Sequence, residues 1–294
     1  MHRENRDQLR GFLLAFTLTL TLLSLVMVIT VMAVQPSMPK SRRQERREEP
    51  AWRPQAEDSL TLAVVGTQGG EPADVLLIRF NPQYGQVPLC LLPPGTLVEP
   101  EEGGSATLAQ VYRAGGGAAV KGALSRRLGV EVDRYAVLSR DLFLRLAEKT
   151  GSVEFELPYE IAYQRDGFSV SIPAGVRRLD GRDIADVLGY PHFPDAEERS
   201  KVLGDLIAAI INQNLDVASD ARSSTVFKLA VNLLDTDVNA ADYEQRRQAA
   251  DFLSQVDAQV AGNLPAAGAP LGEDAFQLSE NCVDLLREYF QATG

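Results

Sequence analysis

Apolar residues and turn-forming residues alternate in short runs between residues 60 and 100. An apolar run that ends in glycine, proline or a polar turn is typical of a buried strand. Three such runs occur: LTLAVVG (60–66), VLLIRF (75–80) and VPLCLL (87–92). The loops that follow the first and third runs read Gln-Gly-Gly (68–70) and Pro-Pro-Gly (93–95), where an α/β enzyme would place charged groups.

Longer segments with a helical period follow these strands. Residues 105–129 predict two helices with a break near Gly115–Gly117, and residues 139–151 predict a helix that Ser139 caps. Further strands are predicted at 132–138, 153–158 and shortly before Asp180, and further helices from Asp180, over 195–215, and near 222–234 and 241–258. A Pro/Gly/Ala loop at 262–272 leads to a final strand and helix within 278–290. This alternation predicts an α/β fold, a layered α/β/α sandwich around a central mixed sheet.

One segment before these elements has the composition of a membrane span. Residues 11–34 contain 24 residues without a charge. A helix of that length extends about 36 Å and can cross a bilayer. We expect an uncleaved anchor; the alternative is a cleavable signal peptide, whose apolar region would be shorter. The basic residues on both sides of the span do not determine its orientation.

These features divide the chain into four parts. Residues 1–10 form a short tail before the span, residues 11–34 the transmembrane helix, and residues 60–294 a large domain after it. Residues 35–59 contain four prolines and many charges and form a linker. The basic residues of the linker either lie on anionic lipid head groups or are simply solvated.

The charge of the large domain restricts its partners. Residues 54–294 carry 20 Lys/Arg against 35 Asp/Glu, a balance of −15. A domain this acidic repels polyanions. We therefore expect no nucleic-acid partner and no role as a transcriptional regulator.

Several kinds of catalytic chemistry have no support in the sequence. The histidines are His2 and His192, and no P-loop, GxSxG, HExxH or GxGxxG motif occurs. Cys90 and Cys282 are interpreted as buried apolar residues, and their separation does not tell whether they form a disulfide. The glycines of AGGGAA (114–119) either allow a close approach between elements or present amides to an anion.

The order of these elements, together with several phrases, resembles the LytR-CpsA-Psr family, also called the cell envelope-related transcriptional attenuator family. The resemblance covers residues 60–215, and the final strand and helix also fit. The phrases are Gly66-Thr67 after the first strand, LPPGTLV, VYRAGGGAAVKGALSRRLGVEVDRY, LFLRLAEKTGSVEFELP and IPAGVRRLDGRDIADVL.

The resemblance implies a single-pass protein of the cell membrane, mainly in Gram-positive bacteria, with a role in cell-wall biogenesis. It also implies that residues 1–10 are a cytoplasmic tail and that residues 60–294 are an extracytoplasmic domain. Family members transfer glycopolymers from a polyprenyl-diphosphate lipid to peptidoglycan. In these members an Arg cluster and Mg²⁺ bound to Asp hold the diphosphate, and an apolar tunnel holds the lipid tail. Developing phosphoryl charge requires such preorganised cations.

This chain departs from the family pattern at most charged positions. Gln68 and Gly70 stand in place of the Asp and Arg of G-x-D-x-R. Pro94 and Gly95 stand in place of the Arg and Asp of P-R-D-T. In the segment that corresponds to R-S-D-T, Asp74 either matches the Asp or falls one place late, on the other strand face. We interpret the loops as a phosphoryl-transfer site that has lost its cations.

Two hypotheses remain open. The first is a catalytically degenerate relative, a pseudoenzyme, that binds polyprenyl-phosphate lipid, cell-wall glycan or an active paralogue at the membrane. The second is an active transferase with relocated residues, in which Asp74 holds a metal, Mg²⁺ if the protein is active, and Arg113 and Arg199 contact phosphate. The simpler interpretation of Arg113 and Arg199 is that both are charged residues on the solvent-exposed surface of a helix.

Overall fold

The computed structural model describes residues 52–147, 152–165, 167–214, 234–256 and 259–291. The predicted span at 11–34, most of the linker and the helix predicted near 222–234 lie outside these residues. In the part of the chain that is described, no helix combines the length and the apolar character that crossing a membrane requires.

A six-stranded mixed sheet forms the centre of the domain, as the sequence predicts. Its order is β11-β6-β1-β2-β3-β12. β1, β2 and β3 are consecutive antiparallel strands, whereas β6 runs parallel to β1 and β12 runs parallel to β3. The strands are β1 (Leu60–Gln68), β2 (Glu71–Phe80), β3 (Val87–Leu92), β6 (Arg134–Ser139), β11 (Asp235–Thr236) and β12 (Ala261–Asn263).

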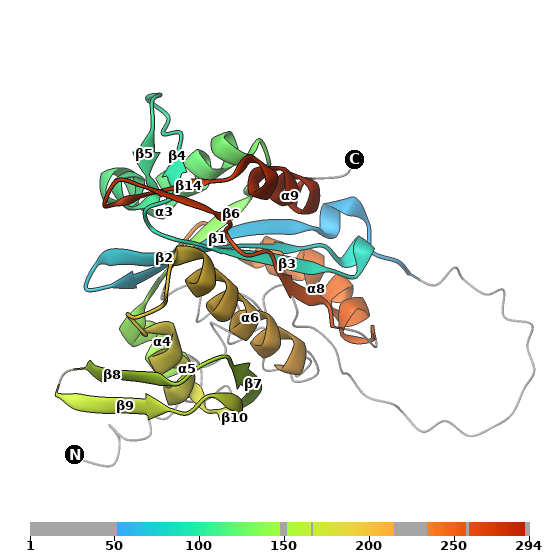
Figure 1. Cartoon of the computed structure of the whole chain (residues 1–294). Helices are drawn as coiled ribbons and strands as arrows, with labels where there is room; N and C mark the ends of the chain where they lie inside the picture. The colour runs from blue at the N-terminus through green and yellow to red at the C-terminus, as the bar shows by residue number, and fades with distance from the viewer. Residues whose placement is uncertain (1–51, 148–151, 166, 215–233, 257–258, 292–294) are drawn as a thin grey trace, which may run out of the picture.

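Helices cover both faces of this sheet, which makes the layered sandwich (Figure 1). One face packs against α3 (Leu108–Leu128) and α9 (Glu280–Phe290). The other face packs against α4 (Arg140–Ala147), α5 (Gly181–Leu188), α6 (Ala196–Asn214) and α8 (Ala240–Ser254). Side chains alternate between the two faces, so Val65 belongs to the first core and Val64 to the second.

Short strands and turns complete the fold. β7 (Val153–Leu157) pairs with β10 (Gly175–Leu179), and β8 (Ile161–Arg165) pairs with β9 (Phe168–Ile172). The remaining elements are β4 (Leu97–Val98), β5 (Ala106–Thr107), β13 (Gly268–Leu271), β14 (Ala275–Leu278), η1 (Ala56–Asp58) and η2 (Pro82–Tyr84). The prediction missed β8, one of the two strands β9 and β10, and the short strands β4, β5, β11 and β12. Interpreting 262–272 as a loop was also wrong, because β13 pairs with β14 as a hairpin there.

The predicted break in the first helix is confirmed. Gly115 and Gly116 leave helical geometry, and Gly116 has a φ of 64°. A Cβ on Gly117 would lie 2.3 Å from the Tyr135 ring of β6. Close approach between α3 and the sheet therefore explains the glycine at 117.

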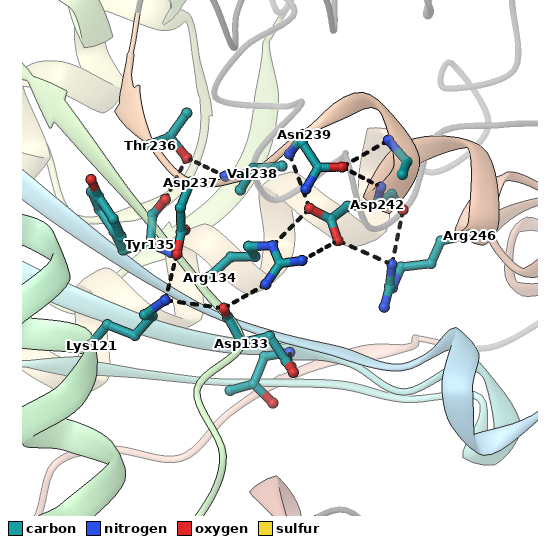
Figure 2. A network of polar contacts seen from close by, with 12 residues as sticks. Lys121, Asp133, Arg134, Tyr135, Thr236, Asp237, Val238, Asn239, Asp242 and Arg246 are labelled. Atoms are coloured by element: carbon teal, nitrogen blue, oxygen red, sulfur yellow. Dashed lines mark hydrogen bonds and ion pairs between the residues drawn. The ribbon is translucent and has the colours of Figure 1, made fainter.

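A polar network joins the segment at 235–246 to β6, the strand next to the edge strand β11 (Figure 2). Arg134 donates through Nε and Nη2 to the two carboxylate oxygens of Asp242, at 2.8 and 2.9 Å. Arg246 lies against the same carboxylate at 3.7 Å, and the side chains of Arg246 and Asp242 are only 8 % and 7 % exposed. Lys121 of α3 forms an ion pair with Asp237. These paired charges hold α8 and the edge strand β11 to the rest of the sheet.

Candidate functional site

The loop between β1 and β2 is a tight turn of two glycines. Gly69 has a φ of 61° and Gly70 a φ of 88°. Two adjacent residues with positive φ form the kind of turn that joins antiparallel strands, and glycine adopts this geometry at no steric cost. The turn geometry explains why Gly70 stands where the family pattern has an arginine.

The loop after β3 is closed by the β13–β14 hairpin. A Cβ on Gly95 would lie 2.4 Å from the carbonyl oxygen of Asp274, and the amide of Phe276 donates to the carbonyl of Gly95 at 2.8 Å. Residue 95 therefore has no space for a side chain. Backbone packing accounts for the missing carboxylate at this position.

Two of the three candidate residues lie together. Asp74 of β2 accepts from Arg199 of α6 through both oxygens: Nε to Oδ1 at 3.0 Å and Nη2 to Oδ2 at 2.5 Å. The two side chains are 16 % and 22 % exposed. Burial raises the pKa of Asp74 above its ordinary value, and the contact with Arg199 offsets this only in part.

The strand register places Asp74 on the same face as α6. Asp74 lies opposite Gly66 of β1, and a shift in register follows, because Thr67 pairs with Pro72. This irregularity is a β-bulge, which reorients the strand locally. Arg113, the third candidate, projects from α3 on the other face and forms an exposed ion pair with Glu71.

A polar cavity of about 290 Å³ lies beside the ends of β1 and β6. Its lining consists of Thr67, Gln68, Gly69, Ser139, Arg140, Asp141 and Arg165. Known ligand pockets have volumes of about 300–1,000 Å³, so this cavity has room for a small head group.

Ser139 also accepts a hydrogen bond from the amide of Leu142 at 3.2 Å, which confirms it as the predicted cap of α4.

Two arginines of this cavity were missed in the sequence analysis. Arg140 begins α4, and its Nη2 atom is buried with no hydrogen-bond partner among the described residues. Arg165 ends β8 and forms an ion pair with Asp186 of α5. No motif marks either residue in the sequence.

The C-terminal end of α5 brings these arginines near Arg199. Arg199 donates to the carbonyls of Leu188 and Tyr190, on either side of Gly189, at 3.3 and 3.1 Å. The Nη2 atom of Arg140 lies 3.1 Å from the position of a Cβ on Gly189. The end of a helix favours cations, which explains in part why guanidinium groups gather here.

The expectation that the cations are lost is therefore wrong in one respect. Arg140 and Arg165 line the cavity, and Arg199 lies near Arg140 at the end of α5. Three carboxylates accompany them: Asp74 and Asp186 are directly paired, and Asp141 lines the cavity. This group of charged residues consequently has little net charge, and Arg140 has the guanidinium that is least compensated.

The residues around Asp74 do not fit the Mg²⁺ that the family resemblance implies. Mg²⁺ binds through carboxylate oxygens, and both oxygens of Asp74 already accept from Arg199. Within the described residues, no three His, Cys, Asp or Glu side chains are grouped so that they could hold a metal.

The layered sandwich is a known architecture. No family model and no curated protein matches this sequence. Among solved structures, a putative transcription regulator from Eubacterium siraeum matches with a TM-score of 0.74 and 16 % identity, over 86 % of this chain and 98 % of its own.

Two further matches are Bacillus subtilis proteins. TagV matches with a TM-score of 0.63 and 13 % identity, over 79 % of this chain and 95 % of its own. TagT bound to LIIa-WTA matches with a TM-score of 0.60 and 16 % identity, over 84 % of this chain and 93 % of its own. TagT and TagV are LytR-CpsA-Psr proteins, so the chain has the fold of that family. At these identities the similarity shows the fold alone.

Proposed function

We propose that the chain is a membrane-anchored cell-envelope protein that binds the phosphate head of a polyprenyl-linked glycopolymer and acts as an accessory in cell-wall biogenesis. Residues 11–34 anchor it as a single span, and the domain from residue 60 lies outside the cell. Of the partners proposed above, a phosphorylated lipid is the one for which the cavity offers specific contacts.

The observation that carries this proposal is the buried, unpartnered Nη2 of Arg140 beside the cavity. A buried guanidinium nitrogen without an acceptor is costly, and a phosphate oxygen is a suitable acceptor for it. Arg165 lines the same cavity. The structure of TagT bound to LIIa-WTA supports this ligand class, because that protein shares the fold.

The same geometry favours a weakened catalyst. Removing one group that stabilises developing charge costs about 10²–10³ in rate. The turn at Gly69–Gly70 and the contact of Gly95 with Asp274 leave no charged side chain at either loop. Asp74 is neutralised by Arg199. Binding without efficient transfer follows from this arrangement.

The second candidate is an active glycopolymer–peptidoglycan transferase with relocated residues. The clustering of Arg140, Arg165 and Arg199 around the end of α5 favours it, because three guanidinium groups can share the charge of a phosphoryl group. Release of the lipid phosphate with transfer of the glycan to peptidoglycan, at many turnovers per protein, would establish this function.

The test is to purify the full-length protein from membranes of its own host and analyse co-purified lipids by mass spectrometry. We expect polyprenyl phosphate or diphosphate species with the wild type and a strong loss with Arg140→Met. A hydrogen bond to a charged group contributes about 1.5–3 kcal/mol, which corresponds to about 10–100-fold in affinity.

Arg113→Met is the matched control, because it removes an exposed arginine outside the cavity. We expect it to retain the lipid. Absence of any polyprenyl lipid from the wild type, or equal retention by the Arg140 variant, would refute lipid binding at this cavity.

A further inference from the structure

The family resemblance implies a divalent cation, and the position next to Asp74 is the one where the chain offers a carboxylate for it. Mg²⁺ usually binds through one or two carboxylates together with substrate phosphates, and it requires oxygen atoms that are free to coordinate. The contacts of Asp74 show whether such oxygens exist here.

Arg199 occupies both oxygens of this carboxylate. The two parallel contacts, at 3.0 and 2.5 Å, form the bidentate geometry that is characteristic of strong arginine–carboxylate pairs. A metal would therefore have to displace the guanidinium from both of them.

Other contacts hold Arg199 in this place. Its Nη1 donates to the carbonyl of Tyr190 at 3.1 Å, and its Nη2 donates to the carbonyl of Leu188 at 3.3 Å. Its guanidinium lies 5.3 Å from the centre of the Phe193 ring. Moving the side chain away would break all these contacts and leave Asp74 without a partner.

No neighbouring carboxylate replaces Asp74 as a metal ligand in the described part of the chain. Asp186 is paired with Arg165, and Asp141 is the one carboxylate among the residues that line the cavity. No group of three metal-ligating side chains is present in this part. The carboxylates near Asp74 are therefore too few to bind a metal, and those that are paired are already neutralised by arginine.

We infer that the Arg199 guanidinium takes the place of a divalent cation beside Asp74, so that the nearby cavity, which neither residue lines, binds its phosphate ligand without a metal. This inference rests on the proposed function for the identity of the ligand. Arginine is always charged and its geometry is fixed, so binding becomes independent of metal supply. Because Asp74 cancels the charge of Arg199, the attraction for phosphate comes mainly from Arg140.

The first measurement tests the metal alone. Mn²⁺ is titrated into the full-length protein in non-ionic detergent, and free Mn²⁺ is followed by electron paramagnetic resonance, for the wild type and for Asp74→Asn. We expect the same weak uptake by both, due to the acidic surface. Uptake by the wild type that the Asn variant lacks would overturn the inference.

The second measurement needs no variant and so does not depend on whether Asp74→Asn folds. Binding of farnesyl monophosphate to the wild type is measured by calorimetry in EDTA and in excess Mg²⁺; a monophosphate is chosen because it chelates Mg²⁺ only weakly. We expect affinities that agree within about twofold, less than the tenfold that about 1.4 kcal/mol represents. Binding at least tenfold tighter with Mg²⁺ would overturn the inference and leave the proposed function intact.

The two measurements separate the two conclusions. If farnesyl monophosphate binds under neither condition, the proposed function fails in its lipid-binding form, and metal-independent binding fails with it. The Mn²⁺ titration still shows separately whether Asp74 is a metal ligand.

Discussion

The carbonyl oxygen of Asp274 lies 2.4 Å from where the Cβ of a side chain on Gly95 would be. Gly95 follows β3 in the loop where the LytR-CpsA-Psr pattern has charged residues, and Asp274 belongs to the turn of the β13–β14 hairpin. The two residues are 179 positions apart in the sequence. This contact makes the missing charge a consequence of packing.

Gly95→Ala is expected to destabilise the domain by about 1–3 kcal/mol, the usual cost of forcing extra atoms into a packed site. Because the nearest atom is backbone, the hairpin itself has to move. Urea unfolding monitored by circular dichroism measures the loss. Gly262→Ala is the control, because a Cβ there meets nothing within 4 Å; equal losses in both variants would contradict the explanation.

Two glycines of α3 are expected to respond in opposite ways to alanine. Gly117→Ala places a Cβ 2.3 Å from the Tyr135 ring and should cost about 1–3 kcal/mol. Gly122→Ala meets only the end of the Arg126 side chain, at 3.4 Å, and should stabilise the helix by about 0.5–1 kcal/mol. Thermal and urea unfolding of both variants test this, and a stable Gly117 variant would show that the ring is not tightly placed.

Removing one partner of the pair between Asp74 and Arg199 leaves the other buried and unpaired. The two single variants are therefore expected to cost more in sum than the double variant. Loss of one partner from a buried pair costs about 3–5 kcal/mol, and the remaining exposure of this pair reduces that to about 2–4 kcal/mol. The double variant Asp74→Leu, Arg199→Met should cost less than the sum of the single variants, with a coupling of about 1–3 kcal/mol.

A double-mutant cycle on urea midpoints measures this coupling. The same cycle on Glu71 and Arg113 is the control, because that pair is exposed, with side chains 59 % and 57 % accessible, and should couple far more weakly. Equal coupling in the two cycles would mean that burial gives the Asp74 pair no special role.

Asp251 is expected to make stability depend on pH. Burial raises the pKa of Asp251 to about 6, and its Oδ1 has no hydrogen-bond partner among the described residues. Since an unfolded Asp titrates near about 3.9, the folded state binds the proton more tightly, and stability rises as pH falls from about 6 to about 4.

Asp251→Asn should therefore stabilise the protein at pH 8, by about 1–2 kcal/mol after allowing for partial exposure, and should lose this advantage at pH 4. Urea unfolding at the two pH values measures the difference. Glu244→Gln removes an exposed carboxylate from the same helix and controls for net charge. If Asp251→Asn were still more stable than the wild type at pH 4, the pH dependence would not come from the raised pKa of Asp251.

Local patterns in the sequence were sufficient for most elements. The apolar runs before Gly66, Asn81 and Pro93 are β1, β2 and β3, and the helix predicted from Asp180 is α5, whose first amides bond to that side chain at 2.8 and 2.9 Å. These features depend on residues that are neighbours in the chain. The strand β8 and the β13–β14 hairpin were missed because their pairing depends on contacts outside a short window.

The candidate site was only partly accessible from the sequence. Asp74 and Arg199 were named as separate candidates, but their pairing across 125 positions was not foreseen. Arg140 and Arg165 were not named at all. In the sequence, a single arginine at the start of a helix or the end of a strand looks the same whether it lines a cavity or points into solvent.

The sequence by itself determined the helices, the long central strands, several caps and the acidic balance of the domain, because these follow from local period and composition. Only the tertiary structure decided that three arginines meet at the end of α5, that Arg199 occupies the carboxylate of Asp74, and that Gly95 has no room for a side chain. The physical reason is that charge pairing and close packing depend on distances in space, and residues far apart in the chain set those distances.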